Sequence, residues 1–282
     1  MPLGFLQAED NNVCVLTQWS VDQYDVLVDA LAWLYLRKPL HSFRIMQGLE
    51  PGTIGLFGNA KQGAIDLLLY DISDIVADLE SADADIRESA KKKQDARMSH
   101  RDGLLFQHIS WIAARLQFPT AEATPPHVRK ADKGFDGVLV DVDIANVQLS
   151  RVVLCEDKAS ISPRGLVTSS IWPDVKSIIA GNRDIEVLDA ITPLLSSLQE
   201  EDRELAIARL VWERARHFRV ALTVGDDQIQ NDAYSHLFNG FDDNAGGEVT
   251  ARLAEVMPMK DVRKYLDDLA TQVVAKIQSM AV

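Results

Sequence analysis

Two short apolar runs in the middle of the chain, each bounded by charged residues, constrain the fold more than any other feature. The first follows Gly134-Phe135-Asp136-Gly137 and reads Val138-Leu139-Val140. The second reads Val152-Val153-Leu154-Cys155 and ends in Glu156-Asp157-Lys158. Apolar runs of this length, rich in β-branched residues and separated by a short link, predict two neighbouring β-strands.

The alternation of side chains along a strand places Glu156 and Lys158 on one face, with Cys155 and Asp157 on the opposite face. If the two strands form a hairpin, Asp136 lies opposite the Glu156 end of the second strand. Carboxylates beside an ammonium group can hold a hard divalent cation with a water molecule next to it. The pattern therefore predicts a metal-dependent site built from Asp136, Glu156 and Lys158.

The segment before these strands, Asp102 to Leu116, predicts an amphipathic helix, because its apolar residues recur every three or four positions. An acid on one strand, Glu-x-Lys on the next and a polar residue on the preceding helix together resemble the PD-(D/E)XK nuclease superfamily, which has the restriction-endonuclease-like fold. The resemblance covers about residues 100–225. Enzymes of this superfamily cut phosphodiester bonds with Mg²⁺, and Mn²⁺ is a common substitute.

The resemblance implies an α/β fold with a mixed central sheet flanked by helices. It also implies that Asp136 and Glu156 bind the metal, that Lys158 orients or activates the attacking water, and that Gln107 completes the site from the helix. His108 is an alternative to Gln107. DNA is the expected substrate, because the superfamily mostly acts on DNA, although nothing in the chain separates DNA from RNA.

Each part of the pattern also has a simpler interpretation. A strand that ends in Glu-Asp-Lys is commonly a strand that runs out into solvent, and Asp136 between two glycines fits a tight turn. The main alternative function is a noncatalytic binding or scaffold subunit that keeps the nuclease fold. An amide at position 107, where a carboxylate would bind a metal more strongly, favours that alternative.

Composition places the protein among ordinary globular domains, with 282 residues, 47% hydrophobic and 25% charged. Two cysteines are too few for a disulfide framework, and no segment resembles a signal peptide or a membrane span, so we expect a cytoplasmic protein. The formal net charge of −13 argues against a large DNA-binding surface, because duplex DNA is bound mostly by basic surfaces. We therefore expect a protein partner, such as a helicase or sensor subunit.

The N-terminal region adds to that expectation. Residues 1–99 are predicted to be mainly helical, and residues 100–282 to form the nuclease-like domain with a helical tail from Val249 onwards. Similar extensions occur on nuclease subunits of bacterial antiphage systems, including those of the Hachiman type, in which a helicase partner controls the nuclease. The resemblance thus implies an effector subunit of antiphage defence.

The remaining segments show simple periodic patterns. Predicted helices cover Gln18–Leu36, Ala64–Arg97 as one long helix or a broken pair, Trp172–Ile179, Ile185–Leu198 and Glu200–Arg216, and predicted strands cover Val13–Leu16 and Phe218–Val224. Two basic features are candidate phosphate contacts, the group from Lys91 to Arg101 and the loop residue Arg164. Both also fit ordinary solvated side chains.

Overall fold

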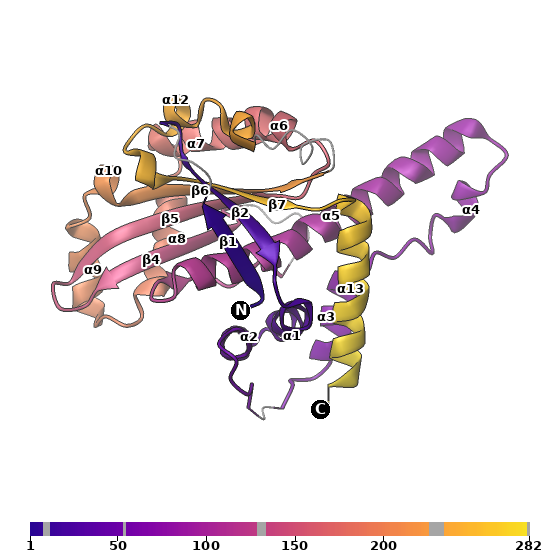
Figure 1. The fold of residues 1–282 in the computed structure, drawn as a ribbon, viewed down its shortest axis with the longest axis horizontal. Helices are drawn as coiled ribbons and strands as arrows, with labels where there is room; N and C mark the ends of the chain where they lie inside the picture. Colours follow the sequence, from indigo (N-terminus) through magenta and orange to yellow (C-terminus); the bar gives the residue numbers. More distant parts are fainter. Residues whose placement is uncertain (8–11, 53–54, 129–133, 226–233, 281–282) are drawn as a thin grey trace.

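The computed structural model describes residues 1–7, 12–52, 55–128, 134–225 and 234–280, which form a mixed α/β structure around one curled sheet (Figure 1). Its seven strands lie in the order β1-β2-β7-β6-β5-β4-β3. The strands are β1 (Leu3–Gln7), β2 (Val15–Val21), β3 (Glu122–Ala123), β4 (Gly137–Asp143), β5 (Gln148–Lys158), β6 (Arg216–Val224) and β7 (Arg252–Pro258).

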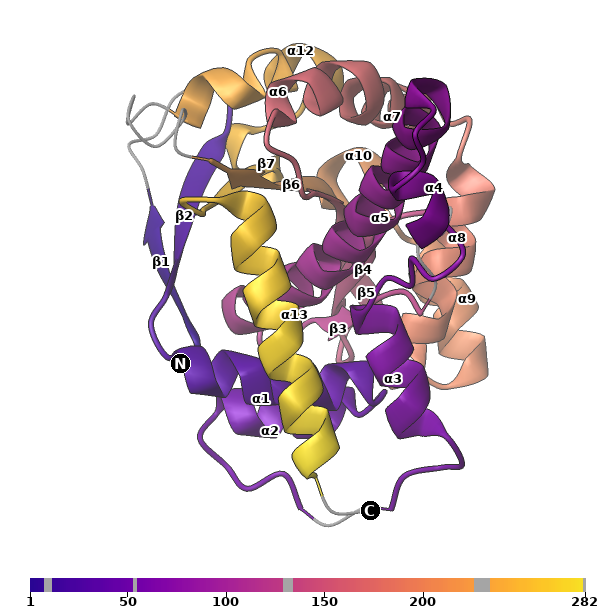
Figure 2. The same cartoon turned by 90° about the vertical axis from the view of Figure 1, so that its right-hand side faces the viewer.

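The helices lie on both faces of this sheet (Figures 1 and 2). They are α1 (Tyr24–Tyr35), α2 (Pro39–Met46), α3 (Ala60–Leu68), α4 (Val76–Leu79), α5 (Ala84–Gln117), α6 (Pro163–Leu166), α7 (Trp172–Ile179), α8 (Asp184–Ile191), α9 (Glu200–Ala208), α10 (Trp212–Ala215), α12 (Phe241–Ala245) and α13 (Val262–Ser279). A π-helical turn, Val167–Ile171, joins α6 to α7.

The two apolar runs form the predicted hairpin. Strands β4 and β5 are antiparallel, with Gly137 opposite Cys155, and a short turn connects them. Strands β5, β6, β7 and β2 are mutually parallel, and β1 and β3 are antiparallel edge strands. Parallel strands buried on both faces are apolar along most of their length, which explains the continuous apolar runs of β5 and β6.

Alternation along β5 divides the core into two layers. Val152 and Leu154 face one side, in the cluster that α7, α8 and α9 cover, whereas Val153 and Cys155 face α5 on the other side. The same division holds in β6, where Val220 packs into the first cluster and Ala221 into the cluster formed with α1, α5 and α13. The two faces of the sheet therefore present different side chains at the end of β5.

Helix α5 is longer than predicted. Asp83 caps its first turn by accepting hydrogen bonds from the main-chain N–H groups of Asp85 and Ile86, and the helix then continues unbroken to Gln117. The predicted break between Arg97 and Asp102 is absent, because Arg101 pairs with Asp267 and Asp102 pairs with Arg263, both on α13. With α4, the N-terminal part of α5 extends away from the sheet (Figure 1).

The structure also corrects predictions near the N-terminus and in the tail. The helix predicted from Gln18 begins only at Tyr24, since Gln18 to Val21 belong to β2. The tail predicted to be helical from Val249 contains β7, a strand between β2 and β6, before α13 begins. Parallel pairing on both sides overrides the helix propensity of alanine, glutamate and methionine in this segment.

The division of the chain at residue 99 stays a prediction. Helix α5 crosses that position without interruption, and β1 and β2 from the N-terminal region lie in the same sheet as β4 to β7. Among the helices in the described ranges, none has the length and apolar character needed to cross a membrane.

Candidate functional site

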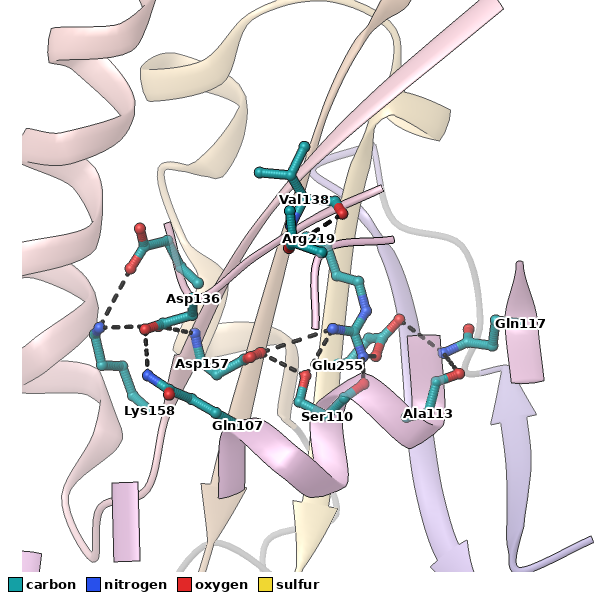
Figure 3. Close-up of polar contacts among 12 residues, drawn as sticks. Gln107, Ser110, Ala113, Gln117, Asp136, Val138, Asp157, Lys158, Arg219 and Glu255 are labelled. Atoms are coloured by element: carbon teal, nitrogen blue, oxygen red, sulfur yellow. Dashed lines mark hydrogen bonds and ion pairs between the residues drawn. The ribbon is translucent and has the colours of Figure 1, made fainter. Parts of the chain in front are cut away.

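The four predicted site residues meet at one end of the sheet. Figure 3 labels three of them, Gln107, Asp136 and Lys158. Asp136 directly precedes β4, and the β4–β5 register places it beside the end of β5. The Nζ atom of Lys158 lies 3.4 Å from Oδ2 of Asp136 and 3.2 Å from Oε2 of Glu156. One ammonium group therefore lies between the two carboxylates, as the alternation of Glu156 and Lys158 on one strand face predicts.

Helix α5 supplies Gln107 and not His108. The Nε2 atom of Gln107 donates a short hydrogen bond to Oδ1 of Asp136. The ring of His108 instead packs in the core, stacked on Tyr35 with a centroid separation of 4.0 Å, and its Nδ1 lies 2.8 Å from the carbonyl oxygen of Leu104. The structure therefore brings the first of the two alternatives to the site.

Asp136 lies at the end of the sheet, where its carboxylate is in contact with side chains from both faces. Gln107 approaches from the α5 side and Lys158 from the opposite side, while the main-chain N–H of Asp157 donates to Oδ2 at 2.7 Å. Its carboxylate thus accepts from three protein donors. This geometry fixes the direction in which Asp136 presents its oxygens.

Burial raises the pKa of Glu156 to about 8, and the neighbouring Asp136 carboxylate acts in the same direction against the opposing effect of Lys158. Burial also opposes the charge of Lys158, but Asp136 and Glu156 outweigh it and raise the pKa of the ammonium group above its usual range. Glu156 therefore holds a proton at neutral pH in the metal-free protein. A divalent cation that binds Glu156 would displace this proton, because metal ligands bind in their deprotonated form.

Behind the site, on the α5 face of the sheet, lies a second group of polar residues (Figure 3). The hydroxyl of Ser110 donates to Asp157 at 2.6 Å and accepts from Nη1 of Arg219 at 2.7 Å. Arg219 also pairs with Glu255 at 2.6 Å, and Glu255 accepts from Gln117 at 3.0 Å. We call these five residues the Arg219 network.

The Arg219 network is buried except for Gln117, which is partly exposed. Arg219 is 1% exposed and Glu255 is 2% exposed. Burial raises the pKa of Asp157 to about 7, although Arg219 acts in the opposite direction. For Arg219, burial is outweighed by Glu255 and other negative neighbours, so its pKa stays above the usual range and the guanidinium remains charged.

This network was not predicted from the sequence. A charged residue inside an apolar strand was the available signal, because a buried charge needs a partner. Arg219 interrupts the apolar run of β6, and Glu255 occupies the corresponding face of β7. Because the segment that forms β7 was predicted to be helical, the pairing of Glu255 with Arg219 was not expected.

The candidate phosphate contacts have other roles in the structure. Arg164 donates from Nη1 to the carbonyl oxygens of Leu237 and Asn239, at 2.9 and 3.0 Å. Arg97 binds Asp74 through both guanidinium nitrogens, and Arg101 is buried. Three lysines of the predicted basic group are exposed on the part of α5 that projects away from the sheet: Lys91, Lys92 and Lys93.

The side chains present are compatible with a magnesium ion. Within the described ranges, no three His, Cys, Asp or Glu side chains gather into a metal-binding cluster. Mg²⁺ does not require such a cluster, because it keeps several waters and commonly binds through one or two carboxylates together with substrate phosphates. Asp136 and Glu156 both lie beside Lys158 and supply two carboxyl groups, and a divalent cation that binds them would displace the proton that Glu156 holds at neutral pH.

The comparisons with known proteins give no family to the chain. No protein-family model, no curated protein and no solved structure matches it.

Proposed function

We propose that this protein is a metal-dependent nuclease with a restriction-endonuclease-like fold that hydrolyses phosphodiester bonds of DNA. One observation carries the proposal. Gln107, Asp136, Glu156 and Lys158, chosen from the sequence pattern, form one contact group at the end of a mixed sheet. A strand alternation that arose by chance would not require a helix residue to contact the preceding acid, and that acid to contact the lysine of the strand.

In this arrangement Asp136 and Glu156 would hold the Mg²⁺ ion. The bound ion would supply charge stabilisation at the phosphate and lower the pKa of a water molecule. Gln107 and the main-chain N–H of Asp157 keep the Asp136 carboxylate in one orientation. Together with Lys158, these groups fix one ligand by three contacts, which reduces the reorganisation needed during the reaction.

Lys158 acts as an ammonium group. Its raised pKa keeps it protonated at neutral pH, so it cannot accept a proton from water. It can instead donate a hydrogen bond to the attacking water or to a phosphate oxygen and stabilise the negative charge that develops there. An electrostatic role for this lysine follows from the two carboxylates beside it.

The biological context that we propose for this activity rests on the sequence resemblance. The net charge of −13 supports a nuclease that receives its DNA with the help of another protein. We include in the proposal an effector subunit of a bacterial antiphage system of Hachiman type, controlled by a helicase or sensor partner.

A noncatalytic subunit with the same fold is the second candidate, and one observation favours it. Both oxygens of Asp136 already accept protein donors, from Gln107 on one side and from Asp157 and Lys158 on the other. A carboxylate whose two oxygens both accept hydrogen bonds from protein groups can have a purely structural role. The two candidates differ in whether metal binding is accompanied by cleavage.

A calorimetric titration with Mn²⁺ tests the proposed site. The wild-type protein should bind Mn²⁺ at one site, and Glu156→Gln should lose that binding. Asp143→Asn is the matched control, because Asp143 is an acid on the same hairpin whose contacts are to Asn146. Absence of binding at millimolar Mn²⁺ contradicts the metal site, and binding without DNA cleavage selects the noncatalytic candidate.

A further inference from the structure

The contact between the Arg219 network and Asp136 passes through one residue, Asp157. Its main-chain N–H donates to Oδ2 of Asp136, while its side chain lies on the other face of the sheet from Glu156 and Lys158. There the carboxylate accepts from Ser110 at 2.6 Å and lies 3.7 Å from Arg219. Ser110 and Arg219, which lie outside the candidate site, therefore fix the orientation of the Asp157 peptide group.

The same network holds the helix that carries Gln107. Ser110 is three residues after Gln107 and lies on the same side of α5. Arg219 donates to both the hydroxyl and the main-chain carbonyl oxygen of Ser110, at 2.7 and 3.3 Å. Two of the three donors to Asp136, the Gln107 amide and the Asp157 N–H, thus depend on the position of Ser110 relative to β5.

The outer part of the network fixes Arg219 itself. Glu255 on β7 pairs with Nη2 of Arg219 at 2.6 Å, and Gln117, at the end of α5, donates to Glu255 at 3.0 Å. The guanidinium also lies over the ring of Trp19 on β2, with Cζ 5.4 Å from the centroid. Helix α5 is consequently attached to the sheet by polar contacts at both Ser110 and Gln117.

A buried ion pair of this kind is weak evidence for stability. Removing charges from water is costly, and apolar replacements of similar volume are often neutral or stabilising. Two carboxylates and one guanidinium inside the protein therefore call for a reason other than packing. Their connection to Asp136 supplies one, since polar groups behind a metal ligand orient it and set its affinity.

We propose that Arg219, Asp157 and Ser110 are positioning residues that hold Asp136 and Gln107 in register for binding the divalent cation. The inference rests on the proposed function, because it assigns the network to the same metal site. The network contacts neither the cation nor the substrate, and it acts through the Asp157 N–H and through the placement of α5.

Asp157→Asn tests the inference, because it keeps the size of the side chain and the main-chain N–H but removes the charge that pairs with Arg219. Ser110→Ala is the second variant, and it removes the bridging hydroxyl without a change in charge. Asp102→Asn is the matched control, because Asp102 is likewise a buried aspartate paired with arginine, in this case Arg101 and Arg263, away from the site.

The measurements are the Kd for Mn²⁺ and the steady-state constants for DNA cleavage, made well below the melting temperature of every variant. We expect Asp157→Asn and Ser110→Ala to weaken Mn²⁺ binding by about 10- to 100-fold, as is typical for residues behind a metal ligand. They should lower kcat while the KM for DNA stays within about twofold, because the network does not touch DNA. Asp102→Asn should change neither constant.

The outcomes separate the two proposals. If wild type binds Mn²⁺ and cleaves DNA, and folded Asp157→Asn and Ser110→Ala match the Asp102→Asn control, the positioning role is overturned and the nuclease remains. If the wild-type protein neither binds Mn²⁺ nor cleaves DNA, the proposed function fails, and the positioning role fails with it. Should Asp157→Asn not fold, Ser110→Ala alone decides between these results.

Discussion

A fall in pH from 7 to 5 is predicted to remove about 2 kcal/mol from the free energy of unfolding through His108 alone. The side chain is 1% exposed. Burial lowers its pKa from the usual 6.5 to about 3, helped by the nearby charge of Arg37 and opposed only in part by the hydrogen bond to Leu104. The native protein therefore keeps His108 neutral through the whole of this pH interval.

The sign and the size follow from proton uptake. In the unfolded chain the imidazole binds a proton as the pH falls below its ordinary pKa, whereas in the native protein it does so only near pH 3. Its contribution to stability is thus complete above pH 6.5 and is lost toward pH 3, by about 1.4 kcal/mol for each pH unit inside the interval. Between pH 6.5 and pH 5, this contribution to the free energy of unfolding falls by about 2 kcal/mol.

Urea unfolding of the wild-type protein and of His108→Phe, at pH 7 and pH 5, measures this contribution. The phenylalanine ring keeps a flat surface against Tyr35 but does not titrate. The wild-type protein should lose about 2 kcal/mol more than the variant over this interval. His100→Gln, an exposed histidine of the same helix, should behave like the wild-type protein. Equal losses in wild type and His108→Phe would refute a neutral buried His108.

Three further predictions concern the core and the site. Glu156→Gln should raise the free energy of unfolding of the metal-free protein by roughly 1–3 kcal/mol at pH 7, because burial opposes the carboxylate charge; a lower urea midpoint would contradict this. Burial raises the pKa of the Cys155 thiol to about 12, so a thiol reagent at pH 8 should label it only after denaturation, and rapid native labelling would contradict this. Leu222→Ala, at a fully buried position of β6, should cost about 2–5 kcal/mol in chemical unfolding, and a loss below about 1 kcal/mol would contradict its central place in the core.

The candidate site was predictable because its signals are local. Two apolar runs with a short link specify the β4–β5 hairpin, and alternation along one strand places Glu156 and Lys158 together. The helical period predicted the helix before the hairpin, and the sequence resemblance then favoured Gln107 on it, with His108 left as the alternative. Each of these inferences uses a few neighbouring residues.

The rest of the fold depends on pairing between distant segments. Strand β7 contains alanine, glutamate and methionine, which favour a helix in isolation, and it becomes a strand because β2 and β6 lie on either side of it. The Arg219–Glu255 pair joins residues 36 positions apart. No local pattern shows that these two charges meet inside the protein.

The length of α5 illustrates the same limit. Arg101 and Asp102 have the appearance of solvent-exposed charges at a helix boundary, and the sequence pattern before them turns polar. In the structure, Arg101 reaches Asp267 on α13 at 3.0 Å, and Asp102 pairs with Arg263 of the same helix. Contacts with the C-terminal helix, over 160 residues away in sequence, keep the long helix continuous.

The initial rate of DNA cleavage with Mg²⁺ or Mn²⁺, on linear, circular and single-stranded substrates, is the most direct test of the proposed nuclease. Wild type and Asp143→Asn should cleave only in the presence of metal, and EDTA should stop them. Glu156→Gln and Lys158→Met should lower the rate by at least about 100-fold, as expected when a group acting on the transition state is removed. Cleavage that persists unchanged in Glu156→Gln, or no metal-dependent cleavage of any substrate by the wild-type protein, would contradict the nuclease assignment.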